Sequence, residues 1–194
     1  KAHPEFFGEI NRDAIALQLR HNCIPAPYSI YKNIYKLPIG NFLQLKENDL
    51  QSGSLPISES YWSLIDTVVN GVNNSFSSNK DVESELEDLI QTSIKQQMIS
   101  DVPLGAFLSG GVDSSLIVAL MQKQTSRSVK TFTIGFDESN FDESKDAAAV
   151  ANYLGTDHTS LHVTDADALK VIPDLPWIYD EPFADSSQIP TYLV

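Results

Sequence analysis

The sequence lacks three features that would place it in well-defined classes of protein. Its 194 residues contain one cysteine, Cys23, which excludes an intrachain disulfide framework and any metal site built from several cysteines. It has no run of eighteen apolar residues, so we expect no membrane-spanning helix. Lys and Arg number 13 against 26 Asp and Glu, and a net charge of -13 argues against nucleic acid as a partner. We therefore expect a cytoplasmic protein that binds neither nucleic acid nor membranes.

Both ends of the sequence indicate a piece of a longer protein. Lys1 stands where a Met would begin a complete chain, and residues 192–194 end inside an apolar run. We divide the chain at residue 60, because residues 1–60 are rich in Pro, Tyr and Asn and precede polar connectors at 46–60 and 70–80. Within the first part we expect a helix at 11–20, a strand-turn-strand at 35–43 and a buried Cys23.

From Asp81 onward the pattern becomes that of an α/β domain. Apolar residues at helical spacing predict a long helix over 81–99, with Asp81 as its N-cap. Apolar and β-branched runs predict strands at 104–108, 129–136 and 159–163, and helices at 116–121 and 144–154 lie between them. This order is typical of a parallel, doubly wound sheet. We expect the two connecting helices on one face of the sheet and the 81–99 helix on the other.

A serine- and glycine-rich loop follows the first predicted strand of this domain. Its two glycines allow a sharp turn, and the next helix directs its free N–H groups and positive dipole end at the same point. Ser115 and two serines of the loop add hydroxyl donors, and a carboxylate there suits a phosphate-bound magnesium. The loop reads Ser109, Gly110, Gly111, Val112, Asp113, Ser114.

The alternative is a turn that only joins a strand to a helix. The complete six-residue loop between a predicted strand and a predicted helix favours phosphate binding over that interpretation. Two other phosphate-binding patterns are missing from the sequence: the Walker loop that ends in Gly-Lys-Ser/Thr, and the Gly-x-Gly-x-x-Gly dinucleotide motif.

The loop resembles the pyrophosphate loop of the N-type ATP pyrophosphatases, and its flanks narrow the resemblance. Residues 98–108, 131–136, 149–151 and 154–158 are similar to class II, glutamine-hydrolysing asparagine synthetases, in the same order. Residues 35–40 resemble the end of the glutaminase domain of that family. The resemblance implies an adenine-nucleotide α-hydrolase-like fold for residues 61–194, preceded at 1–60 by the extended tail of an α+β glutaminase domain.

The family resemblance also implies a reaction and a site. ATP and aspartate would form β-aspartyl-AMP, and ammonia derived from glutamine would displace AMP to give asparagine. Residues 109–114 would hold the pyrophosphate, and Asp113 would help to bind magnesium. Leu108 and Ile134 would contact adenosine, and Gly135 would leave room beside it. A homodimer is a candidate assembly.

The sequence departs from the family pattern in ways that leave other functions open. Cys23 does not occupy the position of the family's N-terminal glutaminase nucleophile, and the second synthetase motif and a downstream lysine are not in the sequence. We expect this piece alone to bind MgATP weakly at most and to make no asparagine. An amidotransferase that acts on another carboxylate, or a non-catalytic nucleotide-binding module, remains an alternative.

Three weaker signals lie near the sheet. The carboxylates between Asp137 and Asp146 indicate a solvated loop in which Asp142 caps the next helix, rather than a cation site. His158 and His162 lie four residues apart on one strand, and no third metal ligand is evident. Residues 179–187 form a polar loop that follows an apolar stretch, and this loop is a candidate for shaping the active site.

Overall fold

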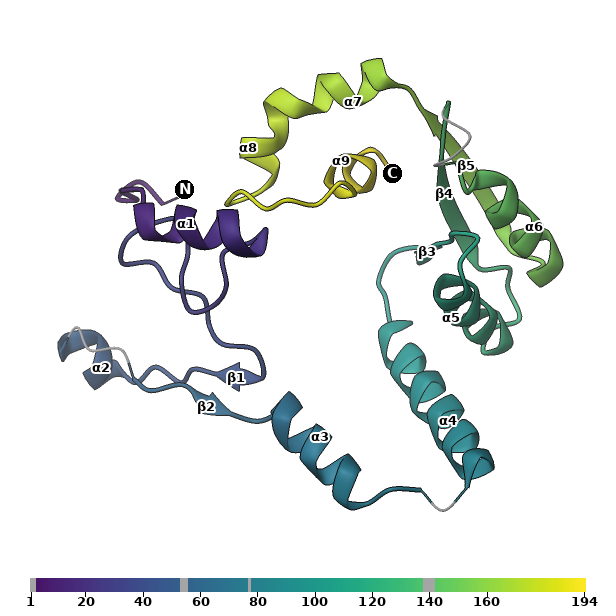
Figure 1. The fold of residues 1–194 in the computed structure, drawn as a ribbon, viewed down its shortest axis with the longest axis horizontal. Helices are drawn as coiled ribbons and strands as arrows, with labels where there is room; N and C mark the ends of the chain where they lie inside the picture. The colour runs from purple at the N-terminus through teal and green to yellow at the C-terminus, as the bar shows by residue number, and fades with distance from the viewer. Residues whose placement is uncertain (1–2, 53–55, 77, 138–141) are drawn as a thin grey trace. The chain divides into compact units, whose positions relative to one another are not determined.

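The computed structural model describes residues 3–52, 56–76, 78–137 and 142–194 (Figure 1). The chain divides into two compact units, of which the first comprises Lys1–Ser75 and Asp174–Asp185 and the second Phe76–Pro173 and Ser186–Val194. Neither limit coincides with residue 60. The assignment of residues 1–60 and 61–194 to two domains therefore stays a prediction. Among the described residues, no helix combines the length and the apolar character needed to cross a membrane.

A parallel sheet of three strands forms the centre of the second unit. The strands β3 (Gly105–Phe107), β4 (Lys130–Phe136) and β5 (Asp157–Val163) lie in the order β3-β4-β5. Helix α5 (Val112–Lys123) joins β3 to β4, and α6 (Ser144–Leu154) joins β4 to β5 (Figure 1). The predicted order of strands and helices is confirmed, and the fold class of this unit is α/β with a parallel sheet.

The two faces of β4 differ in the size of their side chains. Side chains alternate between the faces of a strand, so every second residue shares a face. Thr131, Thr133 and Gly135 are buried on one face. On the other face lie Phe132 and Ile134, which are half-buried. The face with small residues therefore accommodates close packing, and the face with large residues offers an apolar wall.

Helix α4 (Asn79–Gln97) packs beside α5 and not on the second face of the sheet. Ile94 of α4 is buried in one apolar cluster with Leu120 and Met121 of α5. The prediction that this helix covers the second face is wrong, because the C-terminal part of its apolar stripe packs against α5, whereas Leu86 and Leu89 are exposed. The predicted N-cap is also wrong by three positions: the Ser78 hydroxyl accepts from the Asp81 N–H at 3.3 Å, so Ser78 caps the helix.

A second apolar cluster holds the loop region, α5 and α6 together. It contains Leu108 and Val118, together with Ala147 and Ala151 of α6, and all four are almost fully buried. Alanines on α6 allow a close approach to its neighbours. Gly155 ends α6 in the left-handed conformation with φ 71°, as predicted for a residue without a Cβ.

The first unit begins with the predicted helix, α1 (Arg12–His21). The Asn11 side chain caps it, and its buried Ala14 packs with Ile24 and Ile30. Cys23 is exposed, so the prediction of a buried cysteine is wrong. Its neighbour Ile24, which is 2% exposed, takes the place in the core instead.

The predicted strand-turn-strand at 35–43 is correct only in its second half: residues 39–40 turn into a strand at 41–42, but residues 35–38 form no strand. The strand β1 (Asn41–Phe42) pairs antiparallel with β2 (Glu59–Ser60), which lies in a predicted connector. The same connector contains α2 (Glu47–Ser52), and α3 (Leu64–Asn73) follows β2. Each of these strands has only two residues, which is too short to show the alternation of apolar and polar residues from which a strand is predicted.

The remaining elements follow the sheet along the chain. They are α7 (Asp165–Val171), the 3₁₀ turn η1 (Ile172–Asp174), α8 (Leu175–Ile178) and α9 (Gln188–Leu193). Helix α7 packs against α9 within the second unit, whereas α8 belongs to the first unit. The segment that contains α8 thus joins the first unit from a position about a hundred residues downstream of the rest of it.

Candidate functional site

The candidate site begins where β3 gives way to α5. The Leu108 N–H donates to the Phe132 carbonyl at 2.8 Å, which extends the pairing of β3 with β4 by one residue. The chain then turns, and Gly111 takes an extended conformation (φ -77°, ψ 158°) as the residue before α5. In the part of the chain that the structure describes, no side chain caps the N-terminus of α5. Its first N–H groups and its dipole therefore favour an anion at this point.

Ser114 holds the loop in shape. Its Oγ accepts a hydrogen bond from the Ser109 N–H at 3.1 Å and lies 2.8 Å from Ser109 Oγ. Ser109 Oγ in turn accepts from the Gly111 N–H at 3.1 Å. Hydrogen bonds between Ser114 and Ser109 thus connect the first turn of α5 to the start of the loop. This arrangement fixes the loop before any ligand binds, which lowers the ordering cost of binding.

Gly110 is required for a close contact with α6. A Cβ at this position would lie 2.5 Å from Asp146 Cβ, well inside the contact distance of two carbons. A glycine here lets the loop approach the first turn of α6. The loop is therefore held from two sides, by Ser114 of α5 and by α6.

Part of the predicted site lines one pocket of about 370 Å³. Of the predicted residues, Leu108, Ser109, Ser114 and Ile134 contribute to its wall. The pocket thus joins serine hydroxyls at a helix N-terminus to an apolar surface. Such a pairing suits a ligand that carries both an anionic group and a flat apolar one.

The other predicted residues do not line this pocket. Val112 is 82% exposed and Asp113 is exposed, both on the first turn of α5. Gly110 and Gly111 shape the loop through their backbone. Gly135 is buried, and the space beside it is occupied by Asp142 and Ser144, each about 3.1 Å from where a Cβ would lie.

Sequence reasoning missed much of the pocket wall. Three aromatic residues from the large-residue face of the sheet line it: Phe107, Phe132 and Phe136. Thr133 and Glu143 also line it, and four residues of the C-terminal segment complete the set: Ser187, Pro190, Thr191 and Val194. The alternation of β4 could have indicated the aromatic face. Ser187 belongs to the predicted polar loop 179–187, a candidate for shaping the active site, and it does line the pocket. The position of residues 190–194 could not have been found, because it depends on contacts distant in sequence.

The start of α6 contributes an acidic group beside the sheet. The Asp142 carboxylate accepts a hydrogen bond from the Ser144 N–H at 3.1 Å, so it bonds to the first amide of α6 as predicted, although Glu143 and not Asp142 stands at the N-cap position. Hydrogen bonds from the Ser144 hydroxyl and N–H hold the pKa of Asp142 below its usual value, and Lys145 adds attraction. Residues 138–141 of the predicted acidic loop lie outside the described residues.

No ready-made metal cluster is found within the described ranges, where no three His, Cys, Asp or Glu side chains are placed to hold one ion. His158 Nδ1 lies 2.9 Å from Thr131 Oγ1, whereas His162 Nε2 lies 2.7 Å from Asp137 Oδ1. The two histidines thus have separate partners. A single carboxylate such as Asp113 is still compatible with magnesium that arrives on phosphates, because magnesium often takes only one or two protein carboxylates.

The fold and the loop together define a class: an α/β domain whose parallel sheet leads into a glycine- and serine-rich loop at a helix N-terminus. The family model described as asparagine synthase matches residues 85–194, which is more than half of the chain. The chain belongs to the asparagine synthase family.

Curated relatives agree with this membership. A Methanocaldococcus jannaschii protein, provisionally named glutamine-hydrolyzing asparagine synthetase 2, is 38% identical over 188 residues, which cover 95% of this chain and 34% of that protein. Asparagine synthetase B of Escherichia coli is 30% identical over 159 residues, 75% of this chain and 26% of the relative. Asparagine synthetase 1 of Bacillus subtilis is 40% identical over 110 residues, 57% of this chain and 17% of the relative. The chain thus spans about a third or less of the length of these relatives.

Proposed function

We propose that this chain is the ATP-binding part of a glutamine-hydrolysing asparagine synthetase. The parent protein would be an ATP-dependent ligase. It would adenylate the β-carboxylate of aspartate, release pyrophosphate, and then replace AMP with ammonia obtained from glutamine. The observation that carries the proposal is the pocket in which Ser109 and Ser114 meet Leu108 and Ile134. Family membership supports the same reading.

We assign the site as follows. Residues 109–114 would hold the pyrophosphate through the N–H groups of the loop and the hydroxyls of Ser109 and Ser114. The apolar wall with Leu108 and Ile134 would receive adenosine, with Gly135 behind it. Asp113, exposed at the start of α5, would bind magnesium carried by the phosphates. Stabilising the charge that leaves as pyrophosphate would be the main electrostatic task of the loop.

The finer features of the protein are part of the same proposal. The sheet would be completed as a doubly wound sheet in the parent protein, and residues 1–60 would be the end of a glutaminase domain. The parent would be cytoplasmic, and a homodimer is a candidate assembly that sedimentation would test. We also propose that the piece alone makes no asparagine. Asparagine formed from ammonia by the isolated chain would contradict this.

ATP–pyrophosphate exchange in the full-length protein tests the function. We expect exchange that depends on aspartate and falls by about 10- to 100-fold in Ser114→Ala, because that change removes a pocket hydroxyl and the bond that shapes the loop. Ser126→Ala, at an exposed serine outside the pocket, is the matched control and should exchange like the wild type.

Two alternatives give other outcomes in this assay. Exchange that ignores aspartate but responds to a different carboxylate would indicate an amidotransferase with another acceptor. Binding of MgATP without any exchange would indicate a non-catalytic nucleotide-binding module. A wild-type protein that binds no MgATP would refute the assignment of the pocket.

A further inference from the structure

The first unit holds a cavity whose wall is largely aromatic. The cavity has a volume of about 650 Å³, and five aromatic side chains line it: Phe6, Tyr31, Tyr35, Tyr179 and Phe183. All of its lining residues belong to the first unit, and none of them lines the proposed nucleotide pocket. Cavities of this size hold small organic molecules, which are recognised by an apolar wall with a few polar groups. The cavity is thus a candidate ligand site that the proposed function does not use.

Four of these rings form two pairs at nearly right angles. Phe6 and Tyr31 have ring centroids 5.2 Å apart and planes at 89° to each other. Tyr179 and Phe183 have centroids 4.8 Å apart and planes at 85°. The face of an aromatic ring carries the negative part of its quadrupole and attracts cations. Because perpendicular rings form a corner, such a pair can offer more than one ring to a single cation.

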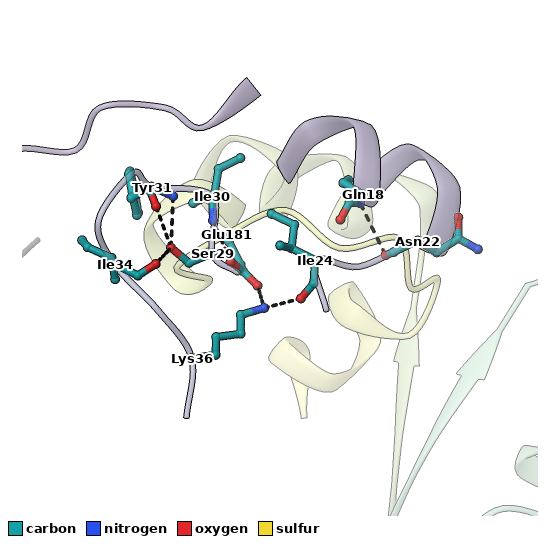
Figure 2. Close-up of polar contacts among 9 residues, drawn as sticks. All are labelled: Gln18, Asn22, Ile24, Ser29, Ile30, Tyr31, Ile34, Lys36 and Glu181. Carbon is teal, nitrogen blue, oxygen red and sulfur yellow. Dashed lines mark hydrogen bonds and ion pairs between the residues drawn. The ribbon is translucent and has the colours of Figure 1, made fainter. Parts of the chain in front are cut away.

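The charged groups of the wall also favour a cation. Lys36 lines the cavity, but its ammonium pairs with Glu181 Oε1 and donates to the Ile24 carbonyl at 2.6 Å (Figure 2). Glu181 Oε2 accepts from the Ile30 N–H at 3.2 Å, so both oxygens of this carboxylate have partners. Asp180 also lines the cavity and is exposed, and among the described residues none forms a hydrogen bond or an ion pair with its carboxylate. The wall therefore carries one uncompensated negative charge.

Hydrogen bonds hold this wall in shape before any ligand binds. Ser29 Oγ donates to the Ile34 carbonyl at 2.8 Å and accepts from the Tyr31 N–H at 3.1 Å (Figure 2). Next to the second ring pair, the Ala184 N–H donates to the Asn22 carbonyl at 2.7 Å. Both ring pairs thus adjoin backbone that is fixed by hydrogen bonds. A preformed wall lowers the ordering cost of binding.

We propose that this cavity binds a small organic ammonium ion, whose cationic head contacts the aromatic rings and whose charge is neutralised by Asp180. An anion is disfavoured, because the ring faces and the carboxylate both repel it. An uncharged molecule of the same shape would contact the same rings but would leave the carboxylate without a counter-charge. The cavity should therefore discriminate between ligands by their charge.

Choline and neohexyl alcohol, its uncharged isostere with carbon in place of nitrogen, are matched probes for this proposal. Each is titrated at constant ionic strength into the full-length protein, in which the isoleucine methyl groups are labelled for NMR. We expect choline to shift the methyl signal of Ile34, which lines the cavity, and to leave that of Ile65 in α3 unchanged. Choline should bind about 10-fold more tightly than neohexyl alcohol, because only choline is attracted by the ring faces and the carboxylate.

Two substitutions separate these sources of attraction. Asp180→Asn keeps the size of the side chain and should weaken choline binding by about 5-fold, with little effect on neohexyl alcohol. Tyr35→Leu, at a residue that is 60% exposed, should weaken choline binding by about 3- to 10-fold. The control is Asp13→Asn, which removes an exposed carboxylate of α1 outside the cavity and should change neither affinity.

Three results would overturn the proposal. The first is equal affinity of the wild type for choline and neohexyl alcohol, and the second is no shift at Ile34 up to about 50 mM choline. The third is equal weakening of choline binding in Asp180→Asn and Asp13→Asn, which would indicate an effect of net charge alone. The titration needs no MgATP, so a failure of the proposed function would leave its outcome unaffected.

Discussion

Gly110 offers a direct test of how the loop is held against α6. A Cβ at Gly110 would lie 2.5 Å from Asp146 Cβ, and two carbons prefer roughly 3.5 Å or more. Both atoms are attached directly to the backbone, so rotation of a side chain cannot relieve the overlap. In Gly110→Ala the loop and the first turn of α6 must therefore move apart by about 1 Å.

The magnitude follows from two opposing effects. Overpacking of this kind costs about 1–3 kcal/mol. Replacing glycine by alanine also restricts the unfolded chain, which stabilises by about 0.4–1 kcal/mol where the backbone conformation is allowed. Gly110 is not among the glycines with positive φ, so the second effect applies. We expect a net loss of about 1–2 kcal/mol.

Urea unfolding followed by far-UV circular dichroism measures this loss, and two other glycines separate its causes. Gly71 lies inside α3 with no atom within 4 Å of its Cβ position, so Gly71→Ala should stabilise by about 0.5–1 kcal/mol. Gly155 has equal space but a φ of +71°, so Gly155→Ala should cost about 1 kcal/mol through the backbone alone.

A second substitution tests the contact itself. Asp146→Gly removes the colliding Cβ, and in combination with Gly110→Ala it should recover about 1 kcal/mol relative to the sum of the single changes. A Gly110→Ala protein as stable as the wild type would refute the reasoning. So would a double variant whose loss equals that sum.

Two further predictions concern a titratable group and the core. The hydrogen bond from the Thr164 hydroxyl, and then one from Lys170, lower the pKa of Asp167 to about 2. Its contribution to stability is therefore complete above about pH 4 and is lost as the pH falls toward 2; NMR titration should show the low midpoint, and a midpoint near 3.8 would contradict it. Val118→Ala, at a fully buried position of α5, should cost about 1–3 kcal/mol in urea unfolding. Val112→Ala on the same helix, 82% exposed, should cost less than about 0.5 kcal/mol, and equal losses would refute the assigned core.

Features set by neighbouring residues could be predicted from the sequence. The loop and its flanking strand and helix depend on glycines, serines and short apolar runs that lie within about 15 residues of one another. The predicted strand at 129–136 differs by one residue from Lys130–Phe136, and the helix Ser144–Leu154 agrees at both ends. In these elements the local pattern and the packing favour the same structure.

Features set by distant contacts could not be predicted. Glu143 belongs to a run of carboxylates, and nothing in that run indicates which member lines the pocket. Lys36 and Glu181 pair across 145 positions, and although each lies in a segment that the sequence singles out, nothing in either segment indicates the pairing. Cys23 and Ile24 show that burial can also be mispredicted between neighbours. Ile24 is buried and Cys23 is exposed, and nothing in the sequence around them indicates which of the two packs into the core.

The alternation along β4 links the packing of the domain to its site. Its small residues, Thr131, Thr133 and Gly135, allow α6 to lie close, and this closeness brings α6 against Gly110 of the loop. Its large residues on the other face line the pocket beside Leu108. A larger residue at Gly135 on the small face should therefore disturb the start of α6, and through it the loop, and leave the aromatic wall intact. A change that trims the large face should weaken only the apolar part of the ligand's contacts. One seven-residue strand thus supports the loop and forms the apolar wall through opposite faces.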